Sequence, residues 1–175
     1  MNPNTHEMPA PAPTNRRPCS RRAALVSLAL GLFAVAAPWG GGLRAEPPPP
    51  LAVIVNAAVP VTVLGKAELA SIFTRANRTW KDGSPIRALN LPPQAPERIE
   101  FDRVVLHMDP EQSAQYWIDR QVRGEEPAPK AIARAETLVR LIQTLPGSIG
   151  FVPEGKVDSK VRVVAWIRDG KVVAP

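Results

Sequence analysis

Few side chains in this sequence are of the types that catalyse reactions or bind metals. His107 is the only histidine after the N-terminal region, and it ends an amphipathic segment, where a cation favours the negative end of a helix dipole. Cys19, the only cysteine, lies in the N-terminal region. Glu125 and Glu126 have no histidine, cysteine or further carboxylate spaced to complete a metal site. No nucleophile is paired with a base in a recognisable motif, so we predict no catalytic residue, no metal and no other cofactor.

The N-terminal region has the three parts of a cleavable export signal. Four arginines come first, an apolar run follows over residues 23–37, and small residues lead to a peptidase site at residues 43–45. We therefore predict a signal peptide over residues 1–45 and a mature protein in a bacterial periplasm. The alternative is an uncleaved membrane anchor, because the apolar stretch up to Trp39 approaches the length of about 20 residues that a span needs.

The export route stays open between the Sec and the Tat pathways. Residues 20–25 resemble the twin-arginine motif of Tat signals, but Ala24 stands where that motif usually has a large apolar residue. Residues 46–50, Glu-Pro-Pro-Pro-Pro, are predicted to form a stiff tether between the cleavage site and the folded region. Residues 51–175 are then long enough for one domain with one core.

The charge of the region after residue 45 is low. Residues 1–45 contain five of the 22 basic side chains and one of the 16 acidic ones, so their removal leaves a net charge of +2. Nucleic-acid binding needs lysines and arginines clustered on one surface, and this sequence has only scattered ones. We therefore expect no nucleic-acid partner.

Apolar runs alternate with amphipathic segments after the tether, which predicts strands alternating with helices. Strands are expected at residues 51–55, 86–89 and 149–152, followed by a hairpin of residues 161–167 and 171–173 around Asp169-Gly170. Helices are expected after Gly65, from Pro96, from Pro110 and before Pro146. This order predicts an α/β domain of two or three layers with right-handed crossovers.

The apolar positions of these segments predict which side chains are buried. The predicted core consists of Leu69, Ile72, Phe73, Phe101, Val105, Trp117, Ile118, Leu141, Ile142 and Phe151. The helix from Pro110 is predicted to have a buried stripe formed by Ala114, Trp117, Ile118 and Val122.

Four short motifs occur in a characteristic order: Glu68-Leu69-x-x-Ile72-Phe73, Trp80-x-Asp82-Gly83-x-x-Ile86, Phe101, and Gly147-Ser148-Ile149-Gly150-Phe151-Val152. In this order and approximate spacing, residues 51–152 resemble phosphate ABC transporter substrate-binding proteins, which have the type 2 periplasmic binding protein fold. The resemblance implies a periplasmic-binding-protein-like lobe, a mixed sheet flanked by helices, over residues 51–175. In full-length relatives such a lobe faces a second one and closes on an oxyanion. This chain is about half as long, which implies a single-lobe or shortened form.

The anion site of that family is not reproduced in this sequence. The family has an arginine after a strand and then Ser-Gly-Thr at a helix N-terminus, which together donate charge-assisted and backbone hydrogen bonds to phosphate. Here Leu91 falls on the arginine position, and Ala95-Pro96-Glu97 falls on Ser-Gly-Thr. Pro96 has no N–H to donate, and Glu97 adds a negative charge. The N–H groups of residues 98 and 99 are expected to remain available to an anion.

The resemblance places the ligand loops at residues 56–62 and 95–98 and brings them together. The side-chain donors near these loops are Thr62, Asn90 and Arg98, which are the candidate ligand-binding residues. Phosphate or another oxyanion is the expected ligand, bound weakly. Two functions follow as alternatives. One is a solute-binding component that works with a membrane transporter, and the other is a protein-interaction module of the same fold that contacts an envelope protein and has no small-molecule ligand.

Overall fold

The computed structural model describes residues 49–175, so the predicted signal peptide lies outside the described residues. The strands are β1 (Leu51–Asn56), β2 (Arg87–Asn90), β3 (Lys130–Ala131), β4 (Ser148–Pro153), β5 (Val161–Arg168) and β6 (Lys171–Val173). The helices are α1 (Lys66–Phe73), α2 (Pro96–Phe101), the π-helix η1 (Asp102–Leu106), α3 (Pro110–Val122), α4 (Ala135–Thr144) and the 3-10 helix η2 (Glu154–Lys156). Each predicted strand and helix is present, with ends shifted by a residue or two.

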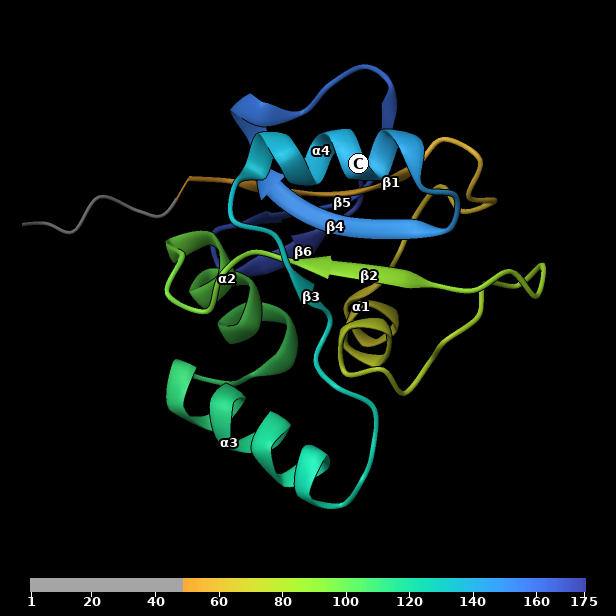
Figure 1. Ribbon diagram of the computed structural model, residues 1–175. Helices are drawn as coiled ribbons and strands as arrows, with labels where there is room; N and C mark the ends of the chain where they lie inside the picture. Colours follow the sequence, from red (N-terminus) through yellow and green to blue (C-terminus); the bar gives the residue numbers. More distant parts are fainter. Residues whose placement is uncertain (1–48) are drawn as a thin grey trace, which may run out of the picture. The chain divides into compact units, whose positions relative to one another are not determined.

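The strands form one mixed sheet in the order β3-β2-β4-β1-β5-β6. Strands β2, β3 and β4 are parallel to one another, whereas β1 is antiparallel to both of its neighbours, β4 and β5. Strand β1 therefore runs in the direction opposite to β2 and β4 (Figure 1). All six of its residues are buried, because it lies near the middle of the sheet with both faces covered.

Helices cover the two faces of the sheet, so the domain has three layers (Figure 1). Helix α4 lies on one face, and α1 and α2 lie on the other. Successive residues of β4 point to opposite faces of the sheet: Gly150 faces α4, and the next residue, Phe151, faces the layer that contains α1 and α2. The predicted α/β fold with a mixed sheet flanked by helices is confirmed.

Three aromatic rings form the centre of the layer that contains α1 and α2. The ring of Phe101 stacks on that of Phe151 at a centroid distance of 4.1 Å, and Phe73 lies 4.5 Å from Phe101. All three side chains are fully buried. The cluster therefore joins α1, α2 and β4 through contacts between residues that are far apart in the sequence.

Side chains cap the starts of two helices, α1 and α3. The backbone N–H of Gly65 donates to Glu68 at the start of α1, at 2.9 Å. At the start of α3, Asp109 accepts from the backbone N–H of Gln112 at 2.8 Å, and the Gln112 side chain accepts from the N–H of Asp109 at 3.0 Å. These reciprocal bonds satisfy N–H groups that have no partner within a helix.

The glycines of the last motif have separate structural roles. Gly147 has a φ of +76°, and its carbonyl oxygen accepts a hydrogen bond from the indole N–H of Trp80 at 3.0 Å. A Cβ on Gly150 would lie 2.8 Å from Leu138 and 3.0 Å from Ile142, so its absence allows α4 to pack directly on β4. The hairpin prediction is also confirmed, since Asp169 and Gly170 join β5 to β6 with φ values of 50° and 69°.

The predicted burial of α3 is wrong. Ile118 is 53% exposed and Val122 is 82% exposed, Ala114 is exposed, and Trp117 is only half-buried. Leu141, on α4, is also half-buried. Helix α3 lies at the outer margin of the domain (Figure 1) and its buried residue is Ser113, so Ile118 and Val122 are left at the surface. The other seven residues of the predicted core are buried.

Candidate functional site

The two loops that the resemblance brings together lie at opposite ends of the sheet strands. Residue Val55 of β1 pairs with Ile149 of β4, and Ala88 of β2 pairs with the same residue from the other side. Because β1 runs antiparallel to β4, the loop after β1 leaves at the end where β2 and β4 begin (Figure 1). The loop after β2 leaves at the other end. The structure therefore does not bring Thr62 together with Asn90 and Arg98.

Part of the backbone of the loop after β1 is already hydrogen-bonded within the domain. The N–H of Ala58 donates to the Asn56 side chain at 3.0 Å, and the N–H of Val59 donates to the Asn56 carbonyl at 3.0 Å. Arg162 donates to the carbonyl oxygens of Val59, at 2.8 Å, and of Ala57, at 3.0 Å. Thr62 is exposed on the same loop.

The start of α2 also lacks the donors of the phosphate site. Leu91 is 3% exposed and packs in the core, and Ala95, the N-cap residue, makes no side-chain cap. The N–H groups of Arg98 and Ile99 both donate to the carbonyl of Ala95, at 2.9 and 3.0 Å. The expectation that these two groups remain available to an anion is therefore wrong, because they already close the first turn of the helix.

Asn90 ends β2 and is 1% exposed. Its carbonyl oxygen accepts a hydrogen bond from the N–H of Ile132 at 2.7 Å, which holds β3 against β2. Its side-chain oxygen has no hydrogen-bond partner among the described residues. Asn90 is not in the wall of the cavity that contains Arg98, so these two candidate residues occupy neighbouring but separate positions.

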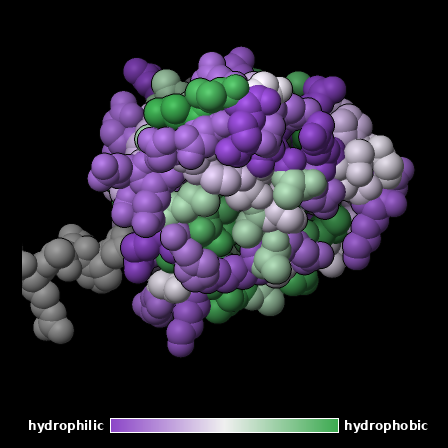
Figure 2. Space-filling view, turned by 90° about the horizontal axis from the view of Figure 1, so that it is seen from below, coloured by the Kyte–Doolittle hydropathy of each residue, from purple (hydrophilic) through white to green (hydrophobic). Residues whose placement is uncertain are grey.

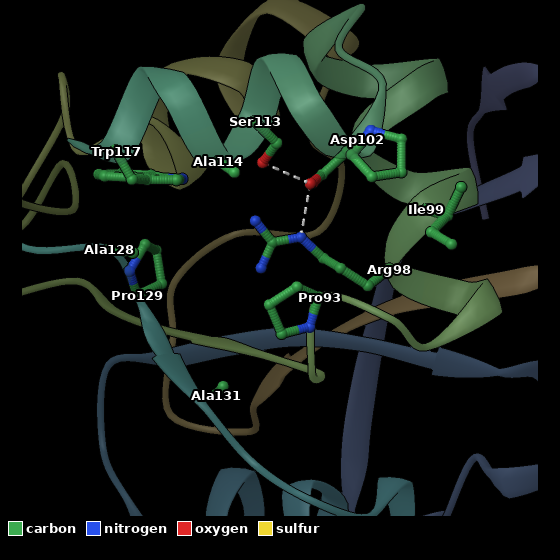
Figure 3. A pocket seen from close by; sticks show the side chains of 11 residues that line it. Pro93, Arg98, Ile99, Asp102, Ser113, Ala114, Trp117, Ala128, Pro129 and Ala131 are labelled. Atoms are coloured by element: carbon green, nitrogen blue, oxygen red, sulfur yellow. Dashed lines mark hydrogen bonds and ion pairs between the residues drawn. The ribbon is translucent and has the colours of Figure 1, made fainter. Parts of the chain in front are cut away.

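Arg98 lies in a cavity of about 220 Å³ between α2, η1, α3 and the segment that enters β3. We call this cavity the Arg98 pocket (Figure 3). Its walls are formed by Pro93, Arg98, Ile99, Asp102, Pro110, Ser113, Ala114, Trp117, Ala128, Pro129 and Ala131. Apart from one ion pair and one hydroxyl, these walls present carbon atoms and the edge of an indole ring.

A buried ion pair forms the polar side of the Arg98 pocket. The Nε of Arg98 donates to Oδ2 of Asp102 at 2.7 Å, and the hydroxyl of Ser113 donates to the same oxygen at 2.9 Å. The side chains of Arg98 and Asp102 are 7% and 6% exposed. Burial raises the pKa of Asp102 above its ordinary value, although the Arg98 charge and the two hydrogen bonds act in the opposite direction.

The local fold explains why this pair forms. Arg98 and Asp102 are four residues apart on one continuous helical segment, so their side chains lie on the same face. At Asp102 the chain changes from α-helix to the π-turn of η1, which ends at His107 in the left-handed conformation, with a φ of 57°. Single π-turns of this kind are frequent at functional sites.

Several polar atoms around the Arg98 pocket have no partner within residues 49–175. Neither terminal nitrogen of Arg98 makes a hydrogen bond there, and both point toward the space beside Trp117 and Pro129 (Figure 3). The indole N–H of Trp117 and Oδ1 of Asp102 are buried and unpaired in the same part of the chain. An unmade hydrogen bond at a buried polar group costs about 1–3 kcal/mol, so the Trp117 and Asp102 atoms indicate a place where a further group can bind.

Arg98 was predicted as a ligand-binding residue, but the partners that define its pocket were not predicted. Asp102, Ser113 and Trp117 were not candidate site residues, and Trp117 was expected in the core. The spacing of Arg98 and Asp102 was a signal for an ion pair on one helix face. Their burial, and the position of α3 over them, depend on tertiary packing.

The acidic pair that was excluded as a metal site forms ion pairs. Glu126 pairs with Arg75 and Arg78, and Glu125 pairs with Arg120 and Arg123. Within the described residues there is no group of three or more side chains suited to hold a metal ion. In that same region, none of the helices has both the length and the apolar character required to cross a membrane.

Comparison with solved structures identifies proteins of the same architecture. An ABC-type phosphate transport receptor from Vibrio cholerae superposes with a TM-score of 0.54 and 19% identity, over 66% of this chain and 45% of the receptor. The domain has the fold of such transport receptors. A Clostridium perfringens protein assigned as a phosphate ABC transporter substrate-binding protein, with bound phosphate, gives the same values, and PstS from Borrelia burgdorferi gives a TM-score of 0.53 at 15% identity.

The match extends over less than half of each of these proteins, 45% of the first two and 46% of the Borrelia protein. At this level of identity the likeness concerns the fold alone. No protein-family model and no curated protein sequence matches the chain. The predicted solute-binding-type fold is thereby confirmed, and the ligand has to be argued from the residues of this chain.

Proposed function

We propose that this chain is an exported solute-binding-type domain that holds an anionic group on the guanidinium of Arg98. The observation that carries the proposal is that the Arg98 side chain is 7% exposed and held by Asp102, while both of its terminal nitrogens lack a hydrogen-bond partner among the described residues and face the Arg98 pocket. A buried arginine with free donors is suited to bind two oxygens of an anion at once. A binding role, with no catalytic step, agrees with the transport proteins that share the fold.

The same proposal covers export and partners. Residues 1–45 act as the signal peptide, residues 46–50 remain as a tether, and residues 51–175 form the binding domain in the periplasm. A membrane transporter is the partner class that a solute-binding role implies. Phosphate binding at the position where the resemblance places it is expected to be weak, because Leu91 and Ala95 supply no donor and Glu97 opposes a negative charge.

An NMR titration with small anions tests the proposed site. In protein recovered from cells that express the full chain, the indole N–H signal of Trp117 is expected to shift and saturate, because this group borders the Arg98 pocket. The indole signals of Trp80 and Trp166 serve as internal controls, since neither lines that pocket. Acetate, phosphate and sulfate are compared at equal ionic strength, so that general screening affects all three equally.

A double variant separates the loss of the site from the loss of the fold. Arg98→Met with Asp102→Leu replaces the buried ion pair by apolar side chains, a change that is often neutral or stabilising. This variant is expected to fold and to lose the saturable Trp117 shift. Arg87→Met, which removes an exposed positive charge at the other end of the sheet, is expected to retain it. Equal shifts in the wild type and the double variant would show that the anion binds elsewhere.

A protein-interaction module is the second candidate, and the exposed face of α3 favours it. Ile118 and Val122 lie one helical turn apart and are 53% and 82% exposed. Figure 2 looks onto the side of the domain where α3 lies and shows apolar patches among hydrophilic residues. Apolar side chains grouped on a surface are typical of contact sites with another protein.

Photo-crosslinking in intact cells tests this second candidate. A photoreactive residue at position 122 is expected to give one adduct of defined mass that is absent when the probe stands at position 171, an exposed residue on edge strand β6. Ile118→Gln should weaken that adduct without changing the Trp117 signal, since Ile118 does not line the Arg98 pocket. Adducts of equal yield from both positions would contradict a specific contact at α3.

A further inference from the structure

The free part of the Arg98 guanidinium is a planar two-donor fork. Its Nε is used by Asp102, so the side chain cannot turn away, and the two terminal nitrogens point together into the pocket (Figure 3). A planar fork held in one orientation matches two oxygens at a fixed spacing, which both a carboxylate and a phosphate offer, so the charge and the walls of the pocket must distinguish them. The buried pair with Asp102 therefore pre-orients the donors before any ligand arrives.

The charge of the pocket limits the charge of its ligand. Arg98 and Asp102 are the charged side chains in its wall, and they neutralise each other. A monoanion binds the two terminal nitrogens of Arg98 and lies near one buried carboxylate, that of Asp102. A dianion such as sulfate, or phosphate above its second pKa, doubles both the attraction to Arg98 and the repulsion from Asp102. It also loses a much larger hydration free energy on entering a pocket whose own two charges cancel.

A carboxylate group alone would leave most of the cavity empty, and the rest of the wall is apolar. A volume of about 220 Å³ is roughly seven times the share of one water molecule in the liquid, which is about 30 Å³. The walls away from the ion pair are proline rings and alanine side chains, contributed by Pro93, Ala114, Ala128, Pro129 and Ala131. These side chains offer contact to carbon and no hydrogen bond, so an apolar tail fits the remaining space.

We infer that the Arg98 pocket binds a monocarboxylate with a short apolar tail, with the carboxylate on the terminal nitrogens of Arg98 and the tail against the proline and alanine wall. This inference rests on the proposed binding of an anion at Arg98 and names the class of that anion. The same chemistry is offered by a free short-chain organic acid and by the carboxyl-terminal residue of a peptide.

A homologous series of acids measures the contribution of the tail. Formate, acetate, propionate and butyrate are titrated while the Trp117 indole signal is followed, with sulfate as the dianion. Affinity is expected to rise about two- to fourfold per methylene until the cavity is filled, and butyrate is expected to bind at least about tenfold more tightly than sulfate. N-acetylvaline distinguishes the two sources, because it binds more tightly than butyrate only if a peptide end is the ligand.

Two variants test the tail and the charge separately. Ala128→Leu, at an exposed position of the wall, should narrow the cavity and remove the advantage of butyrate over formate. Asp102→Asn keeps a hydrogen-bond acceptor beside Arg98 and gives the pocket a net charge of +1, so the preference for butyrate over sulfate should fall by about tenfold.

The outcomes separate this inference from the proposed function on which it rests. If sulfate or phosphate shifts Trp117 at lower concentration than butyrate, the anion site is correct and the ligand class is wrong. If affinity does not change along the acid series, the apolar wall is not part of the site. If no anion shifts Trp117 in a manner that depends on Arg98, both the inference and the proposed anion binding fail.

Discussion

Replacing Phe101 with alanine is expected to lower the free energy of unfolding by about 3–5 kcal/mol. The ring is fully buried, stacks on Phe151 at a centroid distance of 4.1 Å and contacts Phe73 at 4.5 Å. Its removal deletes the contact that joins α2 to both α1 and β4, and the rigid layers around it cannot close the space completely. Urea unfolding followed by tryptophan fluorescence measures the loss.

The matched control for Phe101 is another apolar residue on a helix, Val122, which is 82% exposed. Val122→Ala is expected to change the free energy of unfolding by less than about 0.5 kcal/mol. A loss below 1 kcal/mol at Phe101, or a loss at Val122 comparable to that at Phe101, would contradict the arrangement of the layers. The pair of variants thus tests both the aromatic cluster and the exposed position of α3.

Replacing Gly147 with alanine is expected to destabilise the domain by about 2–5 kcal/mol, from backbone strain and steric overlap together. The residue has a φ of +76°, a conformation that side-chain-bearing residues rarely adopt. A Cβ there would also overlap the carbonyl oxygen of Pro85, and a backbone atom cannot move aside as a side chain can. The carbonyl of Gly147 accepts hydrogen bonds from both the Trp80 indole and the N–H of Arg87, at 3.0 Å each, so displacement of this turn would weaken both.

Gly83→Ala isolates the part of this effect that comes from φ alone. Gly83 has nearly the same φ, +81°, but a Cβ at this position would meet no atom within 4 Å. Its replacement should cost about 1 kcal/mol, clearly less than the replacement of Gly147. Equal losses at the two glycines in thermal or urea unfolding would show that the contact with Pro85 does not matter, and that strain at φ accounts for the whole effect.

The proposed site differs from the one that the family resemblance implies, and the sheet explains the difference. A loop after β1 and a loop after β2 can form one ligand site only if both strands end at the same edge. Here β1 runs antiparallel to β2 and β4, so the two loops begin at opposite ends of the strands. The polar groups without a partner, within the part of the chain described by the structure, instead gather beside α2 and α3, around Arg98.

Local interactions determined the positions of many strands, helix starts and turns of this protein, and these could be predicted from the sequence. The β-branched run of β1 specifies a buried strand, Asp109-Pro110 specifies the start of α3, and Asp169-Gly170 specifies a two-residue turn. Each of these features depends on residues within a few positions of one another, for which spacing and residue type are sufficient. The loss of the family's phosphate-binding donors at Leu91 and at residues 95–97 could likewise be predicted from residue type alone.

Tertiary structure alone decided which apolar face is covered and which charged residue is buried. The pattern of α3 marks Ile118 and Val122 as one face, but whether a layer lies over that face depends on the path of the whole chain. The direction of β1 relative to β2 likewise depends on pairing with β4 and β5, whose residues lie far along the chain from β1. Arg98 was visible in the sequence as a donor, but its burial against Asp102 and Ser113 required α3 to fold back over α2, because only that contact excludes water from the pair.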